Sequence, residues 1–137
     1  MSEIEIKLAA GTDVGLVRKN NEDNFVVNRD LSQSEWIIPQ SSETIPLGKY
    51  GTLLVVADGM GGTNAGEVAS AIAIETVQNA FTPEKLDKIV TFEGEMATEE
   101  AIEEFLTKTI KAADLNIVNA SKEDSSTQGM GTTIVIA

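Results

Sequence analysis

The segment that most constrains the fold is a nearly uninterrupted apolar run at residues 51–57, which ends at Asp58. A short run of this kind predicts a strand that is buried on both faces. Glycines crowd the next four positions and predict a turn over residues 59–62. Residues 63–81 are apolar on most sides, which predicts a helix lying against a sheet. We therefore expect a buried strand that delivers Asp58 to the junction with a packed helix.

Two helices are predicted in all. Thr63 or Asn64 is expected to cap the first, and Asn64 has the spacing of a capping box with Glu67. The second is expected over residues 98–120, because its apolar residues recur at helical spacing. Residues 82–97 between the helices are expected to be a polar linker with a short helical piece. The apolar stripe of the second helix consists of Ile102, Phe105, Leu106, Ile110, Ala113 and Ile117.

The remaining elements are expected to be strands. Residues 4–16 predict a strand with a tight exit, and residues 23–27 and 132–137 predict two short apolar strands. Residues 28–49 carry scattered serines and prolines and are expected to form a long surface loop or small insertion. The length of 137 residues suits one domain.

Composition excludes several classes of chemistry. The chain has no Cys and no His, which removes thiolate and imidazole ligands, cysteine nucleophiles and a Ser-His-Asp triad. Any metal must be a hard cation bound by oxygen. The net charge of −12 argues against nucleic acid and against an anionic membrane surface. The acidic stretch 84–104 is interpreted as a solvated helix face or as a docking surface for a basic partner. With no membrane-spanning run and no signal-peptide pattern, the expected location is cytoplasmic.

The first candidate site is the polar cluster at residues 18–23. Glu22 and Asp23 begin a predicted strand, so their side chains should point to opposite faces. One interpretation is a solvated turn. The other is a cation held by Asp23, with Glu22 reaching it through water and Arg18 available for an anion.

The second candidate is Asp58, at the carboxyl end of the buried strand and next to glycines that permit close backbone approach. The alternative is a helix-entry turn in which Asp58 only accepts backbone hydrogen bonds. A phosphate-binding P-loop is excluded, because Gly61 and Gly66 have its spacing but Glu67 stands where Lys is required.

Together these segments resemble the metal-dependent PPM (protein phosphatase 2C-like) Ser/Thr phosphatases in their bacterial form. Residues 12–24 resemble the opening motif of that family, residues 55–62 with 65–70 its second motif, and residues 129–133 its third. The resemblance covers most of the chain except 28–49 and the 82–97 linker. It implies an α+β fold, the N-terminal half of an α-β-β-α sandwich, left incomplete within residues 1–137.

The resemblance also implies roles for individual residues. Arg18 would clamp the substrate phosphate, and Asp23 would be a metal ligand, with Glu22 binding a metal through water. Asp58 would bridge two Mn²⁺ or Mg²⁺ ions, and Gly59 would ligate through its carbonyl. The implied reaction is hydrolysis of phosphoserine and phosphothreonine in protein substrates by a metal-activated water.

The sequence departs from the family pattern in three respects. Met60 stands where animal members have a His, and Thr63 stands where bacterial members often have one. The family's catalytic domain is also longer, and its later half supplies further aspartate ligands. The first hypothesis is therefore the N-terminal half of a phosphatase that is inactive or nearly so in isolation.

Two alternatives are left open. The chain could be a non-catalytic PPM-like module that pairs with another chain, including a second copy, through the unpaired edge of its final strand. It could also be a small acidic cation-binding protein.

Overall fold

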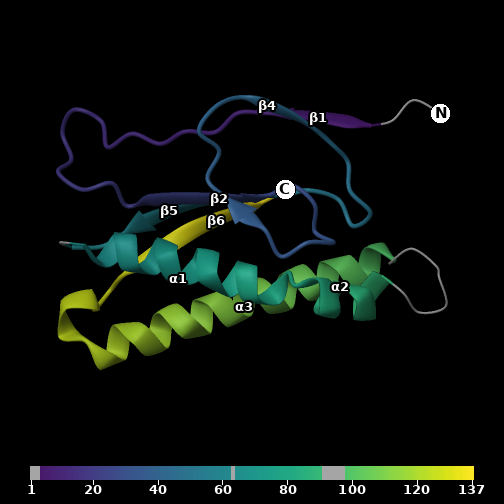
Figure 1. Ribbon diagram of the computed structural model, residues 1–137. Coiled ribbons are helices and arrows are strands. Elements are labelled where there is room, and N and C mark those ends of the chain that lie inside the picture. Colours follow the sequence, from purple (N-terminus) through teal and green to yellow (C-terminus); the bar gives the residue numbers. More distant parts are fainter. Residues whose placement is uncertain (1–3, 63, 91–97) are drawn as a thin grey trace.

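The computed structural model describes residues 4–62, 64–90 and 98–137, and these form an α+β arrangement. A two-stranded sheet lies over a four-stranded sheet, and helices cover the opposite face of the larger sheet (Figure 1). The expected fold class is confirmed. None of the described helices is both long enough and apolar enough to cross a lipid bilayer.

The larger sheet has the strand order β3-β2-β5-β6, with every neighbouring pair antiparallel. The strands predicted around residues 23–27, 51–57 and 132–137 are all present. Strand β5, however, continues through Gly59 and Met60, where a turn was predicted. The reason is pairing with β6, because Gly59 aligns with Thr132 and Met60 with Gly131. The strand bounds are β2 Asp23–Asn28, β3 Trp36–Ile37, β5 Leu53–Met60 and β6 Gly131–Ile136.

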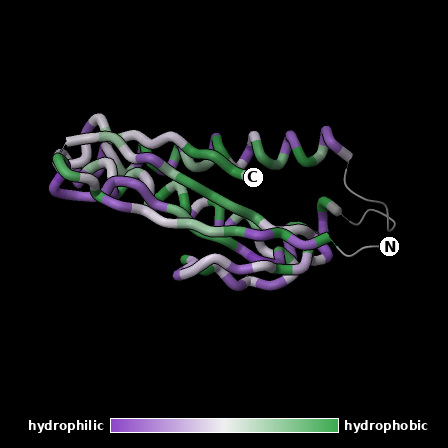
Figure 2. The backbone as a smooth tube through the Cα atoms, turned by 90° about the horizontal axis from the view of Figure 1, so that it is seen from above, coloured by the Kyte–Doolittle hydropathy of each residue, from purple (hydrophilic) through white to green (hydrophobic). Residues whose placement is uncertain are grey.

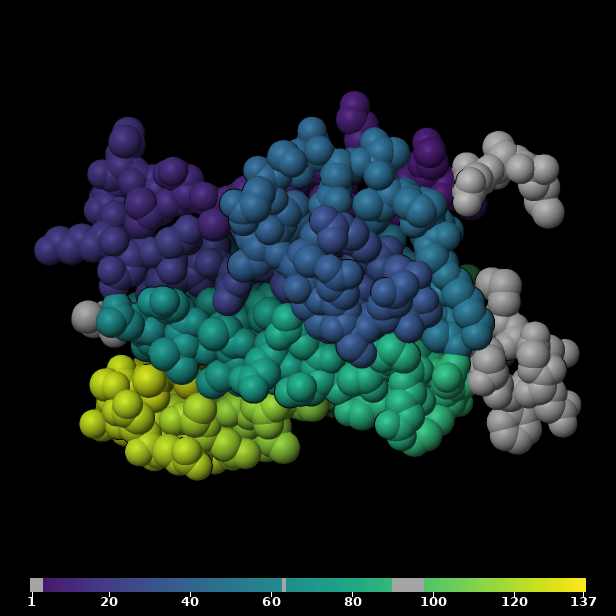
Figure 3. All heavy atoms as spheres, viewed as in Figure 1, coloured from purple at the N-terminus to yellow at the C-terminus, as the bar shows by residue number. Residues whose placement is uncertain are grey.

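The smaller sheet corrects the expectation for residues 28–49. This segment contains β3 and also β4 (Glu43–Pro46), which pairs with β1 (Glu5–Leu8). An ion pair holds the segment to the end of β2, with Arg29 Nε 2.8 Å from Glu43 Oε2. Figure 3 shows the blue atoms of this segment spread over the upper part of the molecule, above the teal and green helices. The predicted strand at 4–16 is shorter than expected, since it ends at Leu8.

Helix α1 (Ala65–Ala80) packs directly on the larger sheet, as predicted. Most residues on its inward face have small side chains, which lets the helix pack closely on the strands. Asn64 is the N-cap, but its side chain makes no hydrogen bond to the helix, so the predicted capping box with Glu67 is wrong. Thr63 lies outside the described residues. The buried residues of α1 are Ala65, Gly66, Ala69, Ser70, Ala73, Ile74 and Val77.

Helix α2 (Pro83–Val90) is the short helical piece expected in the linker, of which residues 91–97 lie outside the described residues. Helix α3 (Glu99–Glu123) packs on α1 and begins at a Thr98 cap. Its predicted apolar stripe is partly wrong, since Ile102 and Ile110 are exposed. Thr109 faces inward instead, and its hydroxyl donates a hydrogen bond to the Phe105 carbonyl (2.9 Å).

The larger of two hydrophobic clusters in the described part of the chain lies between α1 and the larger sheet, and the smaller one lies between the two sheets. Val55 and Ala57 of β5 and Val77 of α1 are almost fully buried in the larger cluster. Phe81 and Phe105 close the core between α1 and α3, with an edge-on ring contact at 4.9 Å between centroids. Long hydrophobic stretches follow the strands, whereas hydrophobic and hydrophilic residues alternate along the helices (Figure 2). Because alternate residues of β5 face this core, the others, including Asp58, point to the opposite face of the sheet.

Candidate metal and phosphate site

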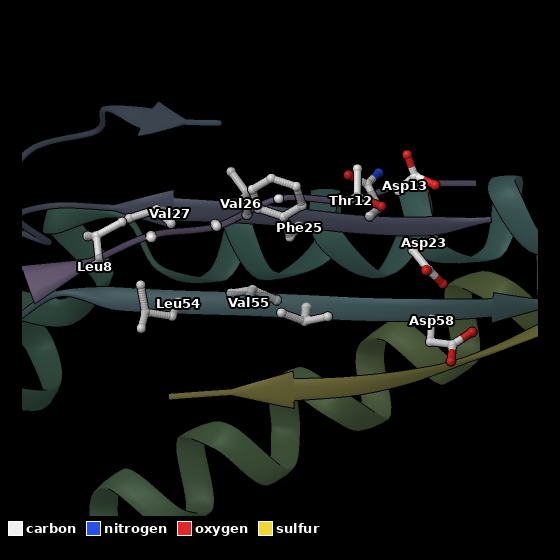
Figure 4. A pocket seen from close by; sticks show the side chains of 15 residues that line it. Leu8, Thr12, Asp13, Asp23, Phe25, Val26, Val27, Leu54, Val55 and Asp58 are labelled. Carbon is white, nitrogen blue, oxygen red and sulfur yellow. The ribbon is translucent and has the colours of Figure 1, made fainter. Parts of the chain in front are cut away.

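The centre of the candidate site is a pair of aspartates on adjacent strands. Asp23 begins β2, Asp58 lies near the end of β5, and the two are direct register partners. Figure 4 shows the two side chains next to each other at one end of a cavity. Neither residue reaches this position through a special loop, because strand pairing alone brings together two side chains far apart in sequence.

The electrostatics of this pair favour a positive ligand. Partial desolvation raises the pKa of the Asp23 carboxyl, and charge repulsion from the facing Asp58 raises it further. Arg18 opposes these effects, and Glu22 adds a smaller increase. Because Asp23 is largely exposed, the effect on its pKa that matters for ligand binding is the repulsion from the facing Asp58 carboxylate. A proton or a cation between the two groups relieves their repulsion.

Arg18 and Glu22 form the second part of the site. Arg18 Nη1 lies 3.0 Å from Glu22 Oε2, with the guanidinium largely exposed and the Glu22 side chain only 11% exposed. Glu22 thus holds one terminal nitrogen of the guanidinium, while most of the arginine side chain remains exposed. A planar guanidinium in this situation can bind a phosphate with two parallel hydrogen bonds.

Two glycines allow three chain segments to meet beneath these side chains. The Gly59 N–H donates a hydrogen bond to the Glu22 carbonyl (3.2 Å). A Cβ on Gly59 would lie 2.0 Å from the Gly66 carbonyl oxygen, and a Cβ on Gly66 would lie 2.8 Å from the Glu22 carboxyl carbon. The entry to β2, the end of β5 and the first turn of α1 therefore meet only because both positions lack a side chain.

The five residues predicted for the site line one polar cavity of about 230 Å³. It adjoins a larger, mainly apolar cavity of about 580 Å³ between the two sheets, which shares Asp13, Asp23 and Asp58 with it (Figure 4). The residues lining the smaller cavity are Asp13, Val14, Arg18, Asn20, Asn21, Glu22, Asp23, Asp58 and Gly59.

The donor set fits a hard divalent cation in type but not in number. Asp23 and Asp58 offer carboxylate oxygens, which Mg²⁺ and Mn²⁺ prefer. Glu22 is engaged with Arg18 and lies against Gly66. Within the described part of the chain, no group of three or more Asp or Glu side chains is arranged to hold a metal ion. Two aspartates alone offer fewer carboxylate ligands than a closed site for such a cation requires.

Sequence reasoning missed two features of the site. Asp13 lines both cavities, and its Oδ1 accepts a hydrogen bond from the Gly15 N–H (2.8 Å) in a local turn. The turn spacing of Asp13 and Gly15 was a detectable signal. Asn20 donates a side-chain hydrogen bond to Asn64, and no local pattern reports such a contact across 44 positions.

Comparison with known proteins gives consistent results. The sequence profile described as protein phosphatase 2C matches residues 46–137. A serine/threonine phosphatase (stp) of Listeria monocytogenes serotype 4b is 34% identical over 126 residues, which cover 92% of this chain and 40% of the relative. The corresponding protein of Listeria innocua is 33% identical over the same coverage. The chain thus spans less than half the length of these curated relatives.

A solved structure agrees in fold. The crystal structure of a variant of a bacterial serine phosphatase superposes with a TM-score of 0.65 at 26% sequence identity. The match covers 100% of this chain and 48% of that one.

Proposed function

The chain belongs to the protein phosphatase 2C family, and from this premise we propose that it supplies part of the active site of a metal-dependent protein serine/threonine phosphatase. The observation that carries the proposal is the convergence of Arg18, Asp23 and Asp58 on one polar cavity. A cation site beside an exposed guanidinium suits a phosphate ester, whose charge both groups neutralise.

Each residue has a separate task in this proposal. Asp23 and Asp58 would hold Mn²⁺ or Mg²⁺, with the Gly59 carbonyl and a Glu22-bound water as further ligands. When bound, two such ions lower the pKa of a coordinated water and neutralise charge on the phosphoryl group. Arg18 would bind the phosphate oxygens and orient the phosphorus toward the carboxylate pair. The ion pair with Glu22 limits the motion of that guanidinium.

Activity is proposed for the complete domain and not for residues 1–137 alone. The match covers only 40% of the length of the Listeria relative. The described residues also offer too few carboxylates for a metal centre. The remaining ligands would come from the portion that the relatives possess in addition. Substrates would be proteins that carry phosphoserine or phosphothreonine.

A chimera tests this proposal. The segment of the Listeria relative that aligns with this chain is replaced by residues 1–137, and phosphate release from a phosphothreonine peptide is measured with Mn²⁺. We expect activity that falls by about a hundredfold or more in chimeras carrying Asp58→Asn or Arg18→Ala. Chimeras that match in circular dichroism but release phosphate equally with and without Asp58 would contradict the proposal.

A second candidate function is a non-catalytic module that pairs with another chain. It is favoured by Val56 and Val135, which are 51% and 63% exposed on neighbouring strands β5 and β6. β6 is also the edge strand of the larger sheet in the described part of the chain. Sedimentation at several concentrations tests self-association. A monomer at all concentrations, unchanged by Val135→Lys, would count against pairing between copies.

A further inference from the structure

The segment that carries Arg18 and Glu22 is fastened to the start of α1 by a side-chain contact. The Asn20 amide donates a hydrogen bond to Asn64 Oδ1, although the two residues are 44 positions apart. Asn64 is the N-cap of α1, yet its side chain makes no hydrogen bond to that helix. Its side chain therefore binds the neighbouring segment, and the N-terminus of its own helix receives no side-chain hydrogen bond from it.

The backbone of Asn64 is suited to this contact. Asn64 has φ 67° and is the only residue other than glycine with positive φ in the described part of the chain. Asn adopts this conformation more readily than most residues, but glycine adopts it with no side-chain restriction. The backbone conformation alone would thus accept glycine, and the side-chain amide needs a separate explanation.

A second, independent contact joins the same segment to the first turn of α1. The Glu22 carboxyl lies against Gly66, in the first turn of α1, where an added Cβ would approach it to 2.8 Å. The Glu22 carbonyl accepts the Gly59 N–H. Residues 18–22 are thus held at Asn20 by the helix cap, at Glu22 by the first helical turn, and at the Glu22 backbone by β5.

We propose that Asn64 is a positioning residue that acts through Asn20 to hold Arg18 and Glu22 over the polar cavity. Asn64 does not line that cavity, whereas Asn20, Arg18 and Glu22 do. The first turn of α1 thereby sets the direction from which the guanidinium meets a phosphate. This inference rests on the proposed function, in which Arg18 binds phosphate.

The variants that test it separate the side chain from the backbone. Asn64→Gly keeps the left-handed conformation and removes the acceptor. Asn64→Asp keeps an acceptor for the Asn20 amide and serves as the conservative rescue. Asn20→Ala removes the same hydrogen bond from the other side, so the double variant should be no worse than either single one.

The first readout is amide hydrogen exchange in the 137-residue chain, observed by NMR. We expect the Gly59 amide, which reports the contact with Glu22, to exchange about fivefold faster in Asn64→Gly and at the wild-type rate in Asn64→Asp. The Val55 amide, in the middle of β5, should be unaffected. Unchanged Gly59 exchange, or equal acceleration at Gly59 and Val55, would overturn the proposal, the latter because it would show a general loss of stability.

The second readout is titration with inorganic phosphate, followed at the Arg18 Nε–H. We expect about fivefold weaker binding in Asn64→Gly and recovery in Asn64→Asp. Equal affinity in all variants would overturn positioning of Arg18. Absence of any Arg18 response in the wild-type chain, with the Gly59 effect intact, would support the positioning contact and would instead contradict the phosphate role in the proposed function.

Discussion

Asp23 and Asp58 are register partners on antiparallel strands, and partial burial together with the facing Asp58 raises the pKa of the Asp23 carboxyl. Strand pairing therefore places two carboxyl groups side by side, and their charges repel when both groups are ionised. An arrangement that opposes stability in this way is typical of a binding site.

The first prediction concerns the stability of the metal-free chain. The pKa of Asp23 is raised above the ordinary value of 3.8, so ionisation of Asp23 destabilises the folded state. This effect is full above the folded-state pKa and disappears as the pH falls through it toward 3.8. Asp58→Asn should therefore raise the midpoint of thermal unfolding at pH 7, with a smaller gain near pH 4. A variant that is less stable than wild type at pH 7 would contradict this account.

The second prediction concerns Gly66. Ala is normally the better helix residue, but a Cβ here would lie 2.8 Å from the Glu22 carboxyl carbon and 2.9 Å from the Gly59 carbonyl carbon. Gly66→Ala should lower the free energy of unfolding by about 1–3 kcal/mol, measured in urea. Gly62→Ala is the matched control, because a Cβ there has nothing within 4 Å. Equal effects of the two substitutions would refute the close approach.

The third prediction concerns the core. Phe81 is 5% exposed and contacts the Phe105 ring, so it joins α1 to α3. Phe81→Ala should cost about 3–5 kcal/mol of unfolding free energy. Leu115→Ala, on the outer face of α3 and 58% exposed in the wild type, should change it by less than about 0.5 kcal/mol. Similar losses in both would mean that α3 does not pack on α1 as described.

The fourth prediction concerns activity of residues 1–137 alone. With too few carboxylates in the described residues to complete a metal centre, the chain should release p-nitrophenol from p-nitrophenyl phosphate only at the background rate with Mn²⁺. Turnover above background that Asp58→Ala abolishes would show that the chain is catalytically sufficient.

Local sequence patterns predicted β5 and α3, because each carries its signal within its own residues. The apolar run before Asp58 identified β5, and apolar residues at helical spacing identified α3. The structure adds the Thr98 cap of α3, whose hydroxyl accepts the Ala101 N–H (3.1 Å). The pairing of β4 with β1 was not predictable, because Glu43–Pro46 finds its partner only in the folded chain. The same is true of Gly59 and Met60, which look like a turn but pair with β6.

The candidate site shows the same division. Motif resemblance selected Arg18, Glu22, Asp23, Asp58 and Gly59, and the fold brings all five to one cavity. Their roles stay predictions. The Asn20–Asn64 hydrogen bond was missed because the spacing of Asn64 and Glu67 favoured a capping box. A local pattern cannot show that a distant side chain competes for the same acceptor.

The most direct test of the central claim is where Mn²⁺ binds on this chain. Paramagnetic broadening of amide signals by substoichiometric Mn²⁺ reports distance from the ion. We expect selective broadening at Asp23, Asp58 and Gly59, with Mg²⁺ competing for the site and Asp58→Asn abolishing the effect. Broadening centred instead on the acidic start of α3, or unchanged by Asp58→Asn, would contradict a metal site at the aspartate pair.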